Sequence, residues 1–360
     1  MSLMESLRKK FLLHKEKKEF YTTRPDVYIV VNKTGLDFIS ENGDYCEKFF
    51  SVCKKLSAEG AFFILVLKIF KGELSEKGEF LKSFIKRLYE NIRLTELWLF
   101  SDFVFSYPEM VNEIVASILY SSFLLFRRIS GNVLCFFPQE VSELLKKFSI
   151  TNDFSITLYI NTFSVPFEEF FRYVIDVKKG GLRMYVDFHK DLIFNGNIDN
   201  FLVELQKLLE VYSKYVESGS IKIYTLDHFI RGKAPGCFTG DCIKNTLTLS
   251  ISGNVYLCVK DLLCYEEGRT SPLGNIYKIP ISSFDEEIFV NPERLKLKKK
   301  QITSRCQCYY WNLCHGICNL YDLNPSRCKD FFLYLERSTP DLKQKLSFEN
   351  PLQRFVRGFY

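Results

Sequence analysis

The sequence predicts an α/β protein with a parallel sheet, open or rolled into a partial barrel, followed by a metal-binding region. Residues 92–230 alternate between short apolar runs and longer amphipathic stretches, which is typical of strands joined by helices. Nine of the twelve cysteines lie beyond residue 236. Because a reducing cytosol disfavours disulfides, this concentration indicates metal ligands in a C-terminal domain.

Five apolar runs of strand length define the expected sheet of residues 92–230. They are Leu94–Phe100, Val133–Phe137, Phe154–Ile160, Leu182–Phe188 and Ile221–Leu226. Helical patterns separate them at Pro108–Tyr120, Pro138–Phe148, Pro166–Val177 and Ile198–Val216, and Phe123–Ile129 is a candidate for a further strand. Since helices of this length connect parallel strands, ligands are expected at the carboxyl ends of the strands.

Residues 1–91 are expected to form a separate, small α+β unit. Strands are predicted at Val27–Val31 and Phe62–Phe70, with a turn at Lys33–Gly35. Helices are predicted at Tyr45–Leu56 and Glu73–Asn91.

The chain changes character after residue 230, where helical periodicity fades. Ser252-Gly253-Asn254 lies between alternating β-formers and predicts a hairpin within Thr246–Cys258. Residues 231–335 are expected to form a cysteine-rich domain, and residues 336–360 a C-terminal tail.

Eight cysteines of this region could fill two sites of four thiolates each. They are Cys237, Cys242, Cys258, Cys306, Cys308, Cys314, Cys318 and Cys328. Four thiolates without paired histidines suit either tetrahedral zinc or an iron–sulfur cluster. The Cys-x2-Cys knuckle of zinc ribbons is missing from the sequence, so the long, mixed spacings favour iron–sulfur over zinc or incidental thiols. Cys264 is left over and is interpreted as a buried or free thiol.

The cysteine-rich segment resembles the SPASM domain, which follows the barrel of many radical SAM enzymes that modify peptides and proteins. The resemblance rests on CIKNTLTLSISGNVYLC (242–258), LGNIYKI (273–279) and CQCYYWNLCHGIC (306–318). One departure is that a single residue separates Cys306 from Cys308 where the domain has two. Another is His315, which stands where glycine is usual.

The resemblance implies two [4Fe–4S] clusters and a partial (β/α)6 barrel of radical SAM type over residues 92–230. The implied ligands of the first cluster are Cys237, Cys242, Cys258 and Cys318. Those of the second are Cys306, Cys308, Cys314 and Cys328.

The motif that radical SAM enzymes need after the first barrel strand, Cys-x3-Cys-x2-Cys, is missing from this sequence. We expect that first strand at Leu94–Phe100, and the residues that follow it, 101–107, contain no cysteine. The chain is therefore similar to pseudo-radical SAM proteins, and no S-adenosylmethionine is expected to bind. No Gly-rich phosphate loop, Gly-x-Ser-x-Gly or paired-histidine motif supports another chemistry. Asp102, Asp187 and Asp227 at predicted strand ends, and His189 beyond one, are interpreted as loop residues.

The sequence thus predicts a non-catalytic protein in ribosomal peptide modification. Its expected partners are a precursor peptide and an active radical SAM/SPASM maturase, with peptide binding or electron relay as its role. Within residues 1–91, FKGELSEKGEFLKSFIKRLYENI (70–92) resembles the helical part of the winged-helix unit that grips leader peptides in such maturases. A structural N-terminal extension is the alternative for this unit. Two alternatives stay open: an enzyme that uses an iron–sulfur cluster with an open iron, and a zinc-stabilised binding scaffold.

Charge and hydropathy favour a cytoplasmic protein without a membrane or nucleic-acid partner. The net charge is +6, and basic runs such as Lys296–Lys300 are interpreted as solvated surface. The apolar stretch Ile114–Phe126 is shorter than the ~20 residues that span a bilayer. Lys15, Lys17 and Lys18 interrupt the place where a secretion signal needs an apolar core.

Overall fold

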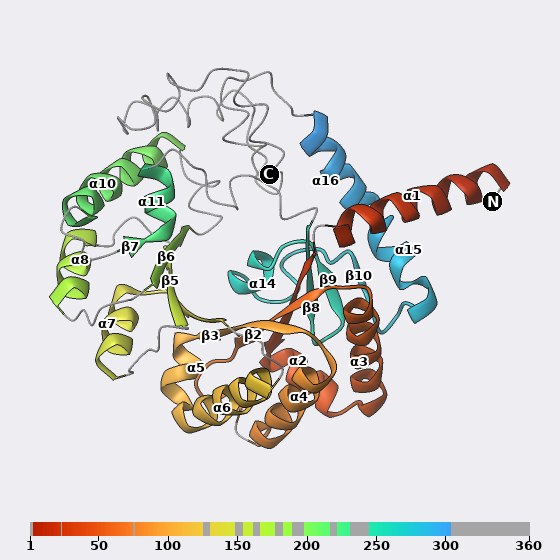
Figure 1. Ribbon diagram of the computed structural model, residues 1–360, viewed down its shortest axis with the longest axis horizontal. Helices are drawn as coiled ribbons and strands as arrows, with labels where there is room; N and C mark the ends of the chain where they lie inside the picture. The colour runs from red at the N-terminus through yellow and green to blue at the C-terminus, as the bar shows by residue number, and fades with distance from the viewer. Residues whose placement is uncertain are drawn as a thin grey trace. The chain divides into compact units, whose positions relative to one another are not determined.

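The structure is a computed structural model (Figure 1). It describes residues 3–22, 24–74, 76–124, 130–147, 154–160, 166–176, 183–188, 198–216, 222–230 and 245–303. The chain forms two compact units. The first comprises Met1–Cys135, Ile150–Ile156 and Cys242–Lys299, and the second Phe136–Ser149, Thr157–Asp241 and Lys300–Tyr360. Within the described residues, no helix has the length and apolarity that crossing a membrane requires.

The first unit is built on a mostly parallel sheet with the strand order β10-β9-β8-β1-β2-β3-β4. Its strands are β1 (Asp26–Asn32), β2 (Phe62–Lys68), β3 (Leu94–Phe100), β4 (Ser130–Cys135), β8 (Thr246–Ser250), β9 (Asn254–Tyr256) and β10 (Gly274–Asn275). Strands β8, β1, β2, β3 and β4 run parallel, whereas β9 and β10 complete antiparallel pairs at one edge. The central strands are almost continuously apolar, as expected for parallel strands that are covered on both faces.

Helices flank this sheet in the described part of the first unit. They are α1 (Leu3–Thr22), α2 (Lys33–Ser40), α3 (Gly43–Ala58), α4 (Gly78–Asn91), α5 (Ser101–Ser106), α6 (Pro108–Leu124), α14 (Lys260–Leu263), α15 (Phe284–Phe289) and α16 (Pro292–Thr303). A 3-10 turn, η1, spans Ile281–Ser283. Helices α4 and α6 lie together on one side of the strands, and α14 lies on the other (Figure 1).

Helix α4 shows why the outer helices pack where they do. Its apolar residues recur at helical spacing and are all buried: Leu81, Phe84, Ile85 and Leu88. The ring of Phe84 lies 5.8 Å from Phe49 and 5.2 Å from Phe50 of α3.

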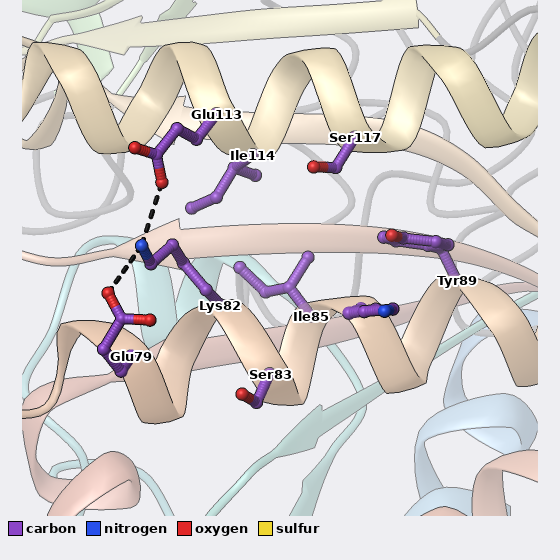
Figure 2. A pocket seen from close by; sticks show the side chains of 9 residues that line it. Glu79, Lys82, Ser83, Ile85, Tyr89, Glu113, Ile114 and Ser117 are labelled. Atoms are coloured by element: carbon purple, nitrogen blue, oxygen red, sulfur yellow. Dashed lines mark hydrogen bonds and ion pairs between the residues drawn. The ribbon is translucent and has the colours of Figure 1, made fainter.

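Toward solvent, Lys82 bridges Glu79 at 2.6 Å and Glu113 of α6 at 2.9 Å, beside a small pocket (Figure 2). Because the charges in this pocket neutralise one another, it is not a candidate site.

The second unit continues the alternation of strands and helices. It contains α7 (Pro138–Lys147), most of β5 (Phe154–Ile160), α8 (Phe167–Asp176), β6 (Arg183–Phe188), α10 (Ile198–Val216), β7 (Lys222–Ile223) and α11 (Tyr224–Ile230). Strands β6 and β7 are parallel. Buried Tyr212 of α10 lies 5.9 Å from the ring of Phe171 of α8 and accepts a hydrogen bond of 2.6 Å from the backbone N–H of Ile223.

The strand pairing differs from the expected separate unit over residues 1–91. Strand β1 is hydrogen-bonded to β2 on one side and to β8 on the other, and β2 pairs onward with β3. Residues 26–68 therefore supply the middle of the sheet, so the expected boundary at residue 91 is wrong. The other domain boundaries stay predictions.

Two local predictions were also wrong. The turn expected at Lys33–Gly35 is the first turn of α2, and the strand expected at Ile221–Leu226 is only two residues long before α11 begins. The predicted hairpin is confirmed: β8 and β9 pair antiparallel around Gly253, whose φ is +92°. The candidate strand Phe123–Ile129 lies largely outside the described residues, and its first two residues belong to α6.

Candidate functional site at the carboxyl edge of the sheet

Strands β8, β1 and β2 end at the same edge of the sheet because they run parallel. In the register of these strands, Asn32 at the end of β1 faces Lys68 at the end of β2, and Val30 faces Ser250 at the end of β8. Ligands of open parallel sheets bind outside such carboxyl ends. This edge is therefore the first place to look for a functional site.

Asn32 is the last residue of β1, and helix α2 begins directly after it. Its side-chain Oδ1 accepts a hydrogen bond of 2.9 Å from the N–H of Gly35 and caps the N-terminus of α2. Its Nδ2 donates to Oε2 of Glu267 at 3.1 Å. The strand thus continues into a helix without a loop that could wrap a ligand.

Glu267 gathers three side-chain donors at this edge. Besides Asn32, Nδ2 of Asn254 donates to its Oε1 at 3.1 Å, and the hydroxyl of Ser252 donates to the same oxygen. Ser252 and Asn254 belong to the turn and second strand of the hairpin, whereas Asn32 ends β1. The carboxylate therefore ties the hairpin to the carboxyl end of β1.

Two glycines let the backbones approach closely here. A Cβ on Gly35 would lie 2.4 Å from Cγ1 of Ile251, in the hairpin turn. A Cβ on Gly253 would lie 2.3 Å from the ring of Tyr277. The first turn of α2 and the hairpin turn are therefore in direct contact at Gly35.

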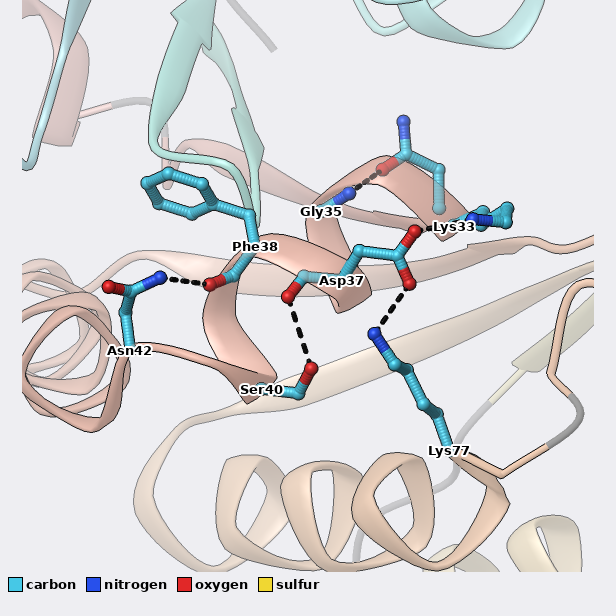
Figure 3. Close-up of polar contacts among 8 residues, drawn as sticks. Lys33, Gly35, Asp37, Phe38, Ser40, Asn42 and Lys77 are labelled. Carbon is cyan, nitrogen blue, oxygen red and sulfur yellow. Dashed lines mark hydrogen bonds and ion pairs between the residues drawn. The ribbon is translucent and has the colours of Figure 1, made fainter.

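Helix α2 is fixed along its length by ion pairs and stacked rings. Asp37 lies between Lys33 at 2.5 Å and Lys77 at 2.6 Å, and both partners lower the pKa of its carboxyl, Lys33 most (Figure 3). Phe38 stacks on Tyr45 at 5.2 Å and on Tyr277 at 5.5 Å.

Tyr277 closes the stack from the side of the hairpin. Its ring lies 4.6 Å from Tyr45, and its hydroxyl donates to the backbone oxygen of Ile251 at 2.7 Å. Burial raises the pKa of the phenol, so Tyr277 stays neutral and acts as a donor.

Lys68 holds the segment that follows the hairpin. Its Nζ donates to the backbone oxygens of Leu262 at 2.7 Å and Tyr265 at 2.8 Å. Burial lowers the pKa of this ammonium, an effect that nearby Cys264 and Glu266 oppose. Sequence reasoning missed both Lys68 and Glu267. A lysine that ends an otherwise apolar strand was the available signal for Lys68.

Cys258 is the one predicted cluster ligand within the described residues. It is half-buried just past β9, where the oxygen of Leu257 accepts a 3.2 Å hydrogen bond from Thr246. The other seven predicted ligands lie outside the described residues: Cys237, Cys242, Cys306, Cys308, Cys314, Cys318 and Cys328. In the described part of the chain, no three His, Cys, Asp or Glu side chains group as a metal site. Thiolate donors of this number suit a [4Fe–4S] cluster, and the confirmed hairpin fits the expected position of Cys258.

The polar residues at other strand ends have local partners. Asp102, in the first turn of α5, accepts from the N–H of Lys71 at 2.5 Å. Asp187 is half-buried on β6 and accepts from the N–H of Phe188 at 2.9 Å. Asp227 is buried in α11, and His189 lies outside the described residues. The carboxylates of Asp102 and Asp187 thus each accept from a nearby backbone N–H.

Comparison with known proteins assigns the fold. No protein-family model and no curated protein matches the chain. A solved structure of native anSMEcpe with bound AdoMet and Cp18Cys peptide matches with a TM-score of 0.55 at 15% identity, over 90% of this chain and 99% of that one. A second, native anSMEcpe with bound AdoMet, matches with the same TM-score at 14% identity, over 90% of this chain and 100% of the other.

The chain shares the fold of these two structures, a mixed α/β fold with a mostly parallel sheet. The first described strand along the chain is β1, not β3 as expected from the sequence. The residues after β1, Lys33–Ser40, also lack cysteine. The next cysteines, Cys46 and Cys53, lie in α3, where burial raises the pKa of both thiols.

Proposed function

We propose that this protein is a non-catalytic radical SAM-like protein that acts in ribosomal peptide modification. It binds two auxiliary [4Fe–4S] clusters and serves a radical SAM maturase as a precursor-peptide-binding or electron-relay partner. The observation that carries the proposal is the carboxyl edge of β1. There, Asn32 leads directly into α2, and neither α2 nor the hairpin turn supplies the three cysteines that a radical SAM enzyme needs.

The sequence after β1 supports the absence of S-adenosylmethionine cleavage. That reaction needs three thiolates that leave one iron open, whereas α2 contains no cysteine. Gly35 and Ile251 are in close contact, and Glu267 uses its oxygens on protein donors.

The proposed ligands of the auxiliary clusters are the eight cysteines, and one of them, Cys258, comes just after the β8–β9 hairpin. Iron–sulfur clusters supply one-electron transfer, with potentials set by burial and by hydrogen bonds to sulfur. The chain's own contribution is to hold the ligand segments, since Lys68 and Glu267 fix residues 262–267 directly after Cys258. These contacts hold the segment next to Cys258 in place, as a cluster that relays electrons would require.

Peptide binding is supported by the solved neighbour that holds a Cp18Cys peptide. The expected mode, addition of a leader strand to a winged helix in residues 1–91, does not suit this sheet. Both β1 and β2 have hydrogen-bonded neighbours on each side, so neither offers a free edge. We therefore place peptide recognition outside these two strands.

The test is to measure iron, acid-labile sulfide and zinc on anaerobically purified full-length protein, together with S-adenosylmethionine cleavage under reducing conditions. We expect about eight iron and eight sulfide per chain, and no cleavage. Cleavage by the isolated protein would establish the alternative, an enzyme with an open-site cluster. Stoichiometric zinc without sulfide would establish the zinc-stabilised scaffold.

A further inference from the structure

Helix α1 has two halves with different surroundings. Its C-terminal half packs on α15 and α16, where Phe20 is buried with its ring 5.0 Å from Phe289. Its N-terminal end extends past these helices (Figure 1), although Lys9 still pairs with Glu286 of α15, and Met4, Leu7 and Phe11 are 62%, 53% and 72% exposed. A group of exposed large apolar side chains on one helix often marks an interaction surface.

The packed half holds the helix in a fixed direction through buried charges. Lys298 of α16 pairs with Glu16 and, at 3.0 Å, with Glu19, and the side chains of Lys298 and Glu16 are only 8% and 7% exposed. Lys17 pairs with Asp285 of α15 at 2.6 Å. Because these ion pairs need one particular arrangement of their side chains, they hold the packed half of α1 in a fixed direction. The exposed half therefore projects as a rigid arm, and its binding to a partner would cost little conformational entropy.

The three exposed residues form a narrow stripe. They are spaced i, i+3 and i+7, and at 3.6 residues per turn they fall within about 60° of arc over roughly 10 Å of helix. This is the anchor spacing by which a helix enters a groove. Exposed basic side chains lie along the stripe: Arg8, Lys10, Lys15 and Lys18.

We propose that the N-terminal half of α1 is a docking helix for a partner protein, with Met4, Leu7 and Phe11 inserted into an apolar groove and the basic residues facing an acidic rim. The inference deepens the proposed function and rests on it for the partner, since the groove would lie on the active maturase. Electrostatic complementarity of this kind mainly sets the association rate and the specificity.

Two other occupants fit less well. A second copy of the arm would bring Arg8, Lys10 and Lys15 against the same charges, and like charges repel. A bilayer surface favours an apolar face of about 100° or more, whereas Arg8 and Lys15 border this stripe closely. An apolar groove is narrow enough to accept this stripe, and acidic edges would complement the basic residues that flank it.

The experiment measures binding of the full-length holoprotein to the purified radical SAM maturase that acts with it on the same peptide. The test variant is Leu7→Ser/Phe11→Ser, and the matched control is Phe137→Ser/Val203→Ser, which removes exposed apolar side chains outside α1. We expect the Kd to rise at least tenfold for the test variant and to stay unchanged for the control. Arg8→Glu/Lys15→Glu should slow association and weaken its salt dependence.

Each other outcome has a distinct meaning. Equal affinity of wild type and test variant would overturn the docking helix and leave the proposed function standing. No complex with wild type would overturn the docking helix and the maturase partnership, while the iron content would still report on the clusters. Wild-type self-association, or co-sedimentation with phosphatidylcholine–phosphatidylglycerol vesicles, that is lost in the test variant would assign the stripe to a second copy or to a membrane and overturn the proposal.

Discussion

Gly35 is the residue on which the closed carboxyl edge depends most directly. A methyl group at this position would meet Cγ1 of Ile251 at 2.4 Å and Oδ1 of Asn32 at 2.9 Å, so both the packing of the hairpin and the cap of α2 would shift. We expect Gly35→Ala to lower the free energy of unfolding by about 1–3 kcal/mol, as overpacking does. Denaturant unfolding of the purified protein measures this change.

Two variants control this prediction. Gly43→Ala adds the same methyl group at the start of α3, where no atom lies within 4 Å, and should be neutral or stabilising. Ile251→Ala should recover part of the loss when combined with Gly35→Ala, which is the coupling expected of residues in contact. Additive effects of the two substitutions would show that they do not meet.

Lys68 should give stability a dependence on alkaline pH. Burial lowers its pKa in the folded state, whereas in the unfolded chain it titrates at its ordinary pKa of 10.5. Between these two pKa values the unfolded state binds more protons, so this residue makes stability rise as the pH approaches 10.5. Lys68→Met should lack that rise. Comparing urea midpoints of the two proteins across this interval isolates the residue, and parallel curves would contradict the prediction.

Helix α1 shows why one element escaped prediction. Its packed face contains Glu16, Glu19 and Lys17, whose partners lie on α15, on α16 and at Glu59 after α3, so the apolar periodicity that reveals other helices is weak. Helix α2 was taken for a turn because of Lys33-Thr34-Gly35. The cap at Asn32, one residue earlier, was a readable signal for its start.

The charged contact between α1 and α16 carries its own prediction. Lys298→Met leaves Glu16 buried without its partner, so we expect a loss of about 3–5 kcal/mol in the stability of this contact. Adding Glu16→Leu should restore much of it, since an apolar pair of similar volume replaces an ion pair at little cost. Hydrogen exchange of the α1 amides reports the effect. Unchanged protection in Lys298→Met would show that the ion pair does not hold the helix.

At the scale of the whole molecule, local patterns predicted the elements and failed to predict their pairing. Strands β3 and β5 and helix α10 have the predicted bounds, because each is defined by its own run of side chains. The pairing of β1 with β8 joins residues 26–30 to residues 246–250, and no local pattern contains that information. The pairing of β1 with β2, and of β2 with β3, likewise makes β1 the first described strand of the sheet, in place of β3.

The hairpin that pairs with β1 also gives the sharpest test of the clusters. Cys258 follows β9, and Cys264 follows α14 only six residues later, so the two cysteines share a neighbourhood and differ in their predicted role. We expect Cys258→Ala to lower the iron content by about four atoms per chain, the loss of one [4Fe–4S] cluster, because three thiolates hold it poorly. Cys264→Ala should keep the full iron content. Equal iron loss in both variants would assign the effect to the fold of residues 258–267 rather than to ligation, and no loss in Cys258→Ala would remove this residue from the ligand set.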